Sequence, residues 1–145
     1  MPELDLIAQL GGLLGRSLAE VSEDRLEQHA QANYALGSDR QHRINTDVYS
    51  LAADGTVSGL LLQPVTSQIL LGFPLHQFRH LRHLQLSNVK LKSYAFLSDL
   101  KGLTSLDLSY NRISDFSFLR DLKGLTSLDL RSNNISSFSF LRDLK

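Results

Sequence analysis

The chain has 145 residues, with 15 Lys and Arg against 15 Asp and Glu, and with no Cys or Trp. This balanced charge makes nucleic acids and acidic membrane surfaces poor candidates for partners, because both are held by a broad positive field. The lack of Cys excludes disulfides, thiolate metal sites and cysteine nucleophiles, and the apolar stretches that hold the 31 Leu residues are far shorter than the ~20 residues of a membrane-spanning helix.

Residues 1–47 predict a helical amino-terminal cap. Four apolar residues near the start recur at helical spacing: Leu4, Ile7, Leu10 and Leu14. Ser22, followed by Glu23 and Asp24, is a typical start for a second helix over residues 26–36, so we expect roughly the first 37 residues to be mostly helical. The terminus is acidic where a secretory signal is basic. We therefore expect a soluble, cytoplasmic protein.

Residues 48–77 predict a hairpin and a degenerate first repeat. Asp54 and Gly55 form a favoured tight-turn pair, and apolar residues alternate on both sides of them. We expect the second arm of the hairpin, residues 56–62, to pair beside a strand at residues 84–86 and so to begin a sheet. Residues 65–75 would then form an irregular return segment, bounded by two Pro residues.

From residue 78 onwards the chain repeats with a period of 22. Residues 100–121 and 122–143 are identical at 18 of 22 positions, and residues 78–99 keep the same apolar skeleton. A fixed period of this length with the spacing L-x-x-L-x-L-x-x-N-x-[IL] is typical of a leucine-rich repeat solenoid. The predicted fold is thus an α/β repeat with a parallel sheet on its concave face, capped at the amino end only; residues 144–145 begin a further unit.

The spacing within each repeat has a mechanical reason. In Leu106-x-Leu108, alternation sends both Leu side chains to one face, as in a short strand, and successive strands stack about 4.8 Å apart. Asn111 and Asn133 follow where the chain must turn inward, and a buried amide can satisfy backbone groups that such a bend leaves unpaired.

The first unit departs from this pattern, because Val89 stands at the Asn position and Asn88 lies one place earlier. Either the bend is shifted by one residue, which we favour, or one amide of the series is missing.

Aromatic residues recur in the return segments. We interpret Phe116 and Phe138 as core, and Phe118 and Phe140 as packed between successive return segments.

The carboxyl end carries no polar cap, although terminal repeats normally have one. Four apolar residues of the last unit should face water: Leu128, Leu130, Ile135 and Phe138. We therefore expect that the sequence is part of a longer protein or that a partner covers this edge, and we expect self-association through the same edge.

Two groups of residues could carry chemistry. His76, His80 and His83 have metal-like spacing, but without a helix this spacing does not place the imidazoles on one face. Asp107 and Asp129 should lie about 5 Å apart on the solvent face of the sheet, where paired carboxylates can exchange protons or bind a cation. We expect no pocket, no nucleophile and no supporting side chains near them, so we interpret them as surface groups. We predict no catalytic residue, no metal and no cofactor.

The strand positions that point away from the core are the candidate protein-binding residues. They are His83, Gln85, Ser87, Ser105, Asp107, Ser109, Ser127, Asp129 and Arg131. Tyr110 and Arg112 lie at the rim and are the best single anchors, because Tyr and Arg are enriched in binding hot spots. The differences between the two near-identical units, including Ser109 against Arg131, all fall at positions expected to reach solvent.

These repeats resemble the 22-residue class of leucine-rich repeat proteins found among bacterial internalins and phosphatase regulators. The resemblance implies a curved solenoid that binds other proteins on its concave face, with no catalytic residue. The amino-terminal pattern Y-x-L-x-x-x-G-x-V-x-G-L-x-L also resembles the start of bacterial repeat proteins that continue into a Roc–COR GTPase. The expected function is a non-catalytic protein-interaction module; the alternative is the amino-terminal regulatory region of a multidomain enzyme such as a Roc–COR GTPase.

Overall fold

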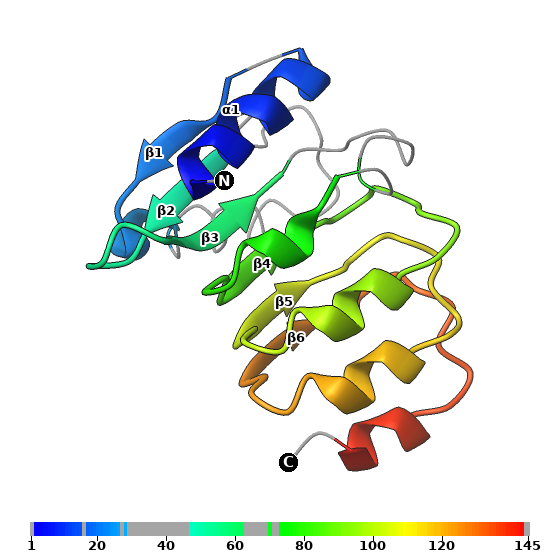
Figure 1. Cartoon of the computed structure of the whole chain (residues 1–145). Coiled ribbons are helices and arrows are strands. Elements are labelled where there is room, and N and C mark those ends of the chain that lie inside the picture. Colours follow the sequence, from blue (N-terminus) through cyan, green and yellow to red (C-terminus); the bar gives the residue numbers. More distant parts are fainter. Residues whose placement is uncertain are drawn as a thin grey trace.

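The structure is a computed structural model that describes residues 2–15, 17–26, 28, 47–62, 70 and 73–143. Its strands form one sheet in sequence order, β1 to β6 (Figure 1). The helix and strands are α1 (Glu3–Leu14), β1 (Ala19–Val21), β2 (Val48–Leu51), β3 (Val57–Leu61), β4 (His83–Gln85), β5 (Ser105–Asp107) and β6 (Ser127–Asp129). Short 3₁₀ helices lie in the return segments: η1 (Leu75–Gln77), η2 (Ala95–Asp99), η3 (Ser117–Asp121) and η4 (Ser139–Asp143).

The sheet is parallel except at the hairpin. Strands β2 and β3 pair antiparallel, and every other neighbouring pair is parallel. The register places Leu60 beside Leu84, Leu84 beside Leu106 and Leu106 beside Leu128. The hairpin therefore begins the repeat sheet, as the sequence predicts, and one row of Leu side chains runs from β3 to the last strand.

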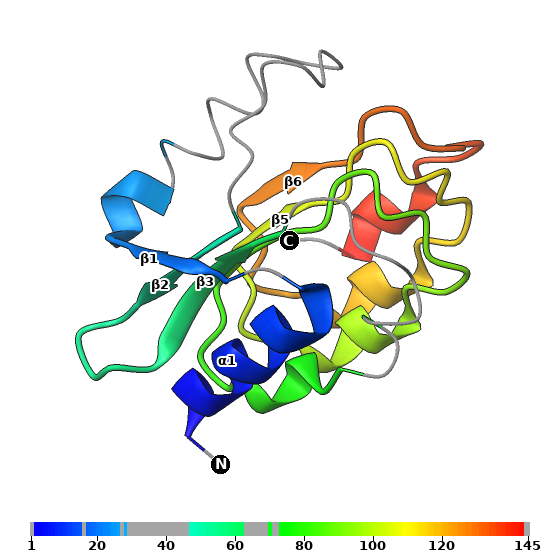
Figure 2. The same cartoon turned by 90° about the horizontal axis from the view of Figure 1, so that it is seen from above.

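The core lies between the sheet and the return segments. Figure 2 shows α1 and the 3₁₀ helices on one side of the sheet, and the turn at residues 23–26 on the other. The main cluster of buried side chains joins α1 to the repeats, whereas a small second cluster joins Leu26 to Val48 and Leu61. Strands β4 to β6 thus separate the continuous apolar core from a face that carries polar side chains, whereas β2 and β3 also contribute to the second apolar cluster.

The amino-terminal region differs from the predicted run of helix. Helix α1 ends at Gly15, whose positive φ of 69° suits glycine, and β1 follows as a strand beside β2. Leu6 is buried and Leu4 is exposed, so the buried face of α1 is rotated from the predicted one. The Ser22 hydroxyl accepts a hydrogen bond from the Arg25 N–H, as in a helix start, but residues 29–36 of the second predicted helix lie outside the described residues.

Glu3 ties α1 to the sheet. Its carboxylate accepts hydrogen bonds from the backbone N–H of Val57 at 2.6 Å and from that of Arg79 at 3.1 Å. One side chain thereby joins the start of the helix to the start of β3 and to the first repeat.

The Asn residues of the repeats satisfy the bend of the preceding repeat. Oδ1 of Asn111 accepts the N–H groups of Val89 and Lys90, and its Nδ2 donates to the carbonyls of Leu86 and Leu108. Because this amide serves two repeats at once, it links them through the core side of the turn.

The backbone angles of the bend decide between the two explanations for Val89 at the Asn position of the first unit. Asn88 and Lys90 have positive φ angles of 58° and 57°, and the residues 22 places later, Tyr110 and Arg112, have φ angles of 62° and 61°. The bend is therefore not shifted, and that expectation is wrong. Val89 is buried at the Asn position, so one amide of the series is absent.

Burial changes at the last described repeat. Phe116 is 5% exposed, whereas Phe138 is 64% exposed. The expectation that Phe138 faces water in the last unit is therefore confirmed, and its interpretation as a core residue is wrong. Leu128, Leu130 and Ile135 are partly buried against the main cluster, so the last described repeat presents a partly open apolar edge.

Within the described residues, no helix is both long and apolar enough to cross a bilayer.

Candidate functional site

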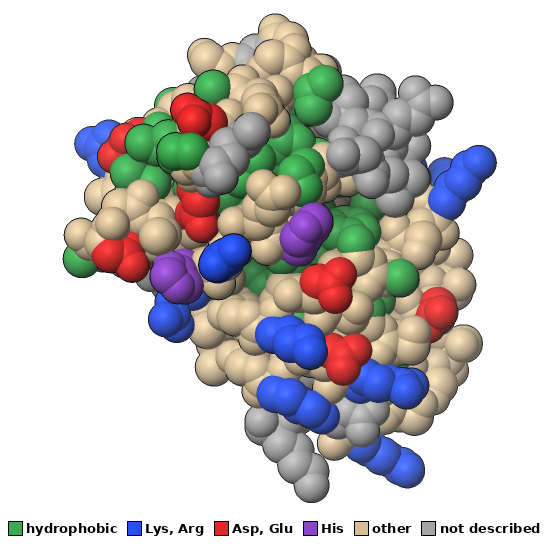
Figure 3. Space-filling view, in the orientation of Figure 1, with side chains coloured by type: hydrophobic (Ala, Val, Ile, Leu, Met, Phe, Trp, Pro, Cys, Tyr) green, Lys and Arg blue, Asp and Glu red, His purple; other side chains and the backbone are tan. Residues whose placement is uncertain are grey.

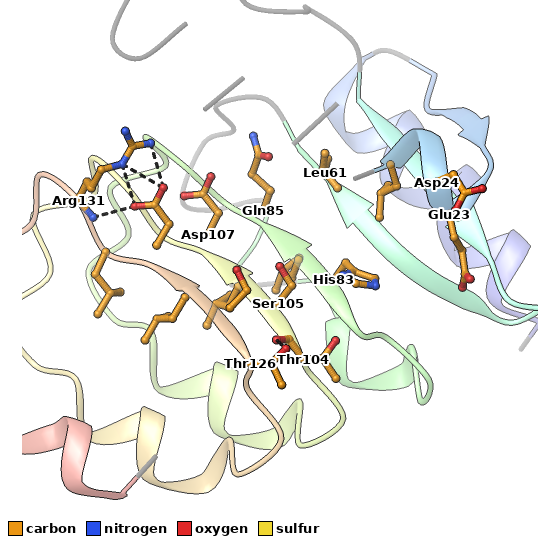
Figure 4. Close-up of a pocket in the computed structure, with 17 residues that line it drawn as sticks. Glu23, Asp24, Leu61, His83, Gln85, Thr104, Ser105, Asp107, Thr126 and Arg131 are labelled. Atoms are coloured by element: carbon orange, nitrogen blue, oxygen red, sulfur yellow. Dashed lines mark hydrogen bonds and ion pairs between the residues drawn. The ribbon is translucent and has the colours of Figure 1, made fainter. Parts of the chain in front are cut away.

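A broad hollow of about 840 Å³ lies on the polar side of the sheet. Strands β4 to β6 supply its floor, and the turn at residues 23–26 supplies a wall (Figure 4). Its polar and charged lining residues are Glu23, Asp24, His83, Gln85, Thr104, Ser105, Asp107, Thr126, Ser127, Asp129 and Arg131.

The parallel register places the floor residues in two rows. One row is His83, Ser105 and Ser127, and the other is Gln85, Asp107 and Asp129. Residues two apart on a strand share a face, and Figure 4 shows Gln85 and Asp107 projecting side by side from neighbouring strands. The floor is therefore a polar surface that changes from His83 and Gln85 on β4 to Ser and Asp on both β5 and β6.

A glycine allows the wall to approach the sheet. Gly59 in β3 lies beside His83, in the same row as Ser105, and a Cβ at this position would overlap the side chain of Leu26. Leu26 fills that space and is 2% exposed. Its packing positions Glu23 and Asp24 at the edge of the hollow.

The hollow is acidic, although the chain as a whole is neutral. Four carboxylates line it against one guanidinium, that of Arg131. Arg131 lies against Asp129, with Nη2 at 2.9 Å from Oδ2, so that cation and that carboxylate offset each other. By contrast, several Lys and Arg side chains gather over the lower part of the molecule in the orientation of Figure 1, as Figure 3 shows.

Asp107 has a different environment from Asp129. Burial raises the pKa of Asp107, and the neighbouring Asp129 adds to this effect, while hydrogen bonds from Ser109 lower the pKa in part. Desolvation disfavours the ionised form of a carboxyl group, so the protein holds this charge at a cost in free energy.

Comparison with known proteins identifies the repeats. A family described as "Leucine Rich repeats (2 copies)" matches residues 79–121 and 101–143. Residues 79–143 are leucine-rich repeats. Comparison with curated proteins found no match.

Solved structures of similar fold include two internalins from Listeria monocytogenes str. 4b F2365. Internalin C2 is 35% identical over 50% of this chain and 32% of its own, with a TM-score of 0.47. Internalin InlF is 21% identical over 92% of this chain and 35% of its own, with a TM-score of 0.53. The chain thus spans about a third of the length of each, and the likeness to InlF supports the leucine-rich repeat fold.

The structure separates the eleven predicted binding residues into three groups: seven in the hollow, two in the bend, and the buried Ser87 and Ser109. Seven of them line the hollow: His83, Gln85, Ser105, Asp107, Ser127, Asp129 and Arg131. Tyr110 and Arg112 lie outside it, in the left-handed bend of the leucine-rich repeat.

Two of the predicted residues do not reach solvent. Ser87 and Ser109 are each 2% exposed, because the following repeat covers them. The Ser109 carbonyl accepts the Asn88 N–H and its own N–H bonds to Asp107. The expectation that every difference between the two near-identical repeats faces solvent is therefore wrong at Ser109.

The expectation that no pocket lies near Asp107 and Asp129 is wrong, because both line the hollow. Sequence reasoning also missed the wall and one row of the floor. Thr104 and Thr126 precede β5 and β6, and each bonds to the carbonyl of the repeat before it, Arg82 and Thr104 respectively. Their equal place in each repeat is a signal that could have been read. Glu23 and Asp24 offer no such signal, because only the packing of Leu26 over Gly59 brings them to the hollow.

The histidine group does not converge. His80 contacts the Thr56 hydroxyl and lies 3.7 Å from Asp54 at the hairpin, whereas His83 lines the hollow. Among the described residues, no three His, Asp or Glu side chains could hold a metal ion together.

Proposed function

We propose that this chain is a non-catalytic protein-interaction module that binds a partner in the hollow of its leucine-rich repeat sheet. The observation that carries the proposal is the hollow itself, a concave polar floor on β4 to β6 with a wall from the amino-terminal segment. The floor combines exposed and half-buried polar side chains on a rigid sheet, and such a surface can vary in sequence without disturbing the core.

The chemistry of the hollow favours protein over nucleic acid. An excess of carboxylates repels a phosphate backbone, whose binding depends on Lys and Arg. Leu128 and Leu130 border the hollow, but they alternate with the polar residues of the floor and pack against the core, so a partner on the floor would meet mainly polar side chains.

The size of the surface sets the expected affinity. The three parallel strands of the floor, about 4.8 Å apart, span about 10–15 Å, and such a floor covers less than the ~800 Å² per partner of a standard protein interface. We therefore expect binding of an extended segment with modest affinity. A module that acts alone and the regulatory region of a larger enzyme such as a Roc–COR GTPase would both use this surface.

Selection from a displayed library of linear peptides tests the proposal. Peptides selected on the unaltered chain should lose affinity at least tenfold, a change of about 1.4 kcal/mol, for the Ser127→Arg variant, because the new side chain fills the hollow. Ser136→Arg is the matched control, since Ser136 is exposed in the same repeat and does not line the hollow. Peptides that bind both variants equally, or a library that yields no binder, would contradict the proposal.

A second proposal concerns the last repeat, which we propose to associate with a second copy of the chain. Strand β6 ends the strand order, so one of its edges pairs with no described strand, and unpaired edges are templates for strand pairing. Phe138 and Leu141 lie exposed in the same repeat. This proposal is tested by sedimentation, as set out in the Discussion.

A further inference from the structure

The floor of the hollow holds a buried acceptor with no partner. Gln85 is 5% exposed, and its Oε1 atom makes no hydrogen bond. Buried polar atoms in native proteins are nearly always satisfied, and an unsatisfied one costs free energy. An acceptor that lines a binding hollow can meet this need with a donor from a ligand.

Asp107 lies beside Gln85 in the sheet register and offers a second acceptor. It accepts hydrogen bonds from Ser109, and the positive charge of Arg131 attracts it. That guanidinium also forms an ion pair with Asp129, with Nη2 at 2.9 Å from Oδ2. A single described cation of the lining is therefore shared between two carboxylates of the floor, which leaves an excess of negative charge beside Gln85.

The surroundings select the sign and kind of ligand. With four carboxylates and one guanidinium, the described residues of the lining carry a formal charge of −3 when His83 is neutral. Since no three described side chains converge on a metal position, an organic cation fits better than a metal ion. A guanidinium or ammonium group carries several N–H donors and can reach a carboxylate and an amide oxygen on adjacent strands.

We propose that Gln85 and Asp107 form a subsite for a basic side chain, Arg or Lys, of an extended segment in a protein partner. The subsite rests on the proposed function, because it specifies what the hollow recognises. Arg131 marks one side of the subsite, and Glu23 and Asp24 add negative charge from the wall. The raised pKa of Asp107 is consistent with a carboxylate that gains from a cation.

The test uses peptides selected on the whole, unaltered chain and analogues in which each Arg or Lys is replaced by norleucine. The basic anchor should contribute about tenfold or more to affinity on the unaltered chain, and its replacement should change affinity less than about twofold on the Asp107→Asn variant. Gln85→Leu should weaken the same peptides. Asp121→Asn is the matched control, because Asp121 is exposed at the end of η3 and outside the hollow.

The outcomes distinguish failure of the subsite from failure of the interaction module. Peptides that Ser127→Arg excludes, but whose affinity needs no basic residue or shows no coupling to Asp107, would overturn the subsite and leave the interaction module standing. Peptides indifferent to Ser127→Arg would overturn both. If Asp107→Asn alters the sedimentation of the chain alone, the occupant is a second copy, and the subsite for a partner's basic side chain is also overturned.

Discussion

The repeats at residues 100–121 and 122–143 share 18 of 22 residues, yet their side chains experience different environments. Phe116 and Leu119 are buried in the first repeat, while Phe138 and Leu141, their counterparts in the second, are exposed. Identical residues in these two repeats therefore differ in exposure, because the first repeat has a described neighbour on both sides and the second has one on a single side.

This difference shows where the stability of the fold resides. In a solenoid, burial is created at the interface between repeats and not within a repeat. The stack of Phe116 on Phe140, with ring centroids 4.6 Å apart, is such an interface. Matched substitutions at equivalent positions of the two repeats can therefore separate the contribution of a neighbour from that of the residue itself.

The largest difference is expected for the phenylalanines. Phe116→Ala should lower the free energy of unfolding by about 3–5 kcal/mol, because it leaves a cavity beneath Phe140. Phe138→Ala should lower it by less than about 1 kcal/mol, since this ring is mostly in water. Urea denaturation followed by circular dichroism measures both, and equal losses would mean that the last repeat is covered.

The asparagines should show the next largest difference. Asn111→Ala removes the acceptor for two N–H groups and the donor for two carbonyls in a buried turn, so we expect a loss of about 3 kcal/mol. Asn133 also accepts two N–H groups and donates to two carbonyls, with Ile113 as one of its donors, but it is only partly buried. Water can therefore replace these bonds, and Asn133→Ala should cost about 1 kcal/mol. Thermal denaturation of the two variants tests the order, and a larger loss at Asn133 would contradict it.

The sequence was most informative where the repeat determines position. The 22-residue period predicted the parallel sheet and the row from Leu84 to Leu128. The Asp54-Gly55 turn and the alternation around it predicted the hairpin beside the first repeat. The period could also have excluded a shifted bend at Val89, because the backbone angles repeat even where the side chain does not.

The hollow was predicted only in part, for a physical reason. Its floor follows from strand alternation, but the burial of each side chain depends on the repeat that follows it. Ser109 is covered by the following repeat, whereas Arg131, in the last described repeat, is exposed. The wall depends on a contact between Leu26 and Gly59, residues far apart in the chain. Neither neighbouring repeats nor such a contact leaves a local pattern in the sequence.

Sedimentation of variants at the two ends of the molecule tests the proposed self-association. If exposed apolar side chains of the last repeat drive self-association, Leu141→Ser should increase the monomer fraction at high protein concentration by several-fold, as expected for a loss of about 1 kcal/mol of apolar contact. Leu4→Ser is the matched control, because Leu4 is similarly exposed on α1 at the other end. Equal effects of the two variants would indicate nonspecific adhesion, and a monomer throughout would contradict self-association.

The smallest effects, which should have opposite signs, are expected at the equivalent aspartates. Asp129→Asn should lower stability by less than about 1 kcal/mol, because it weakens a partly exposed ion pair with Arg131. Asp107→Asn should slightly raise stability at neutral pH, because it removes a charge that burial and Asp129 disfavour while an amide oxygen can still accept the Ser109 N–H.

The pH dependence distinguishes this cause from a general effect of asparagine. Since the folded pKa of Asp107 lies above its usual value of 3.8, the folded state binds this proton more tightly than the unfolded chain does. The contribution of Asp107 to stability therefore becomes more favourable as the pH falls from neutral through the folded pKa toward 3.8. Urea midpoints of the unaltered chain and Asp107→Asn should converge over that range, whereas a gap that stays constant with pH would show that the charge is not its cause.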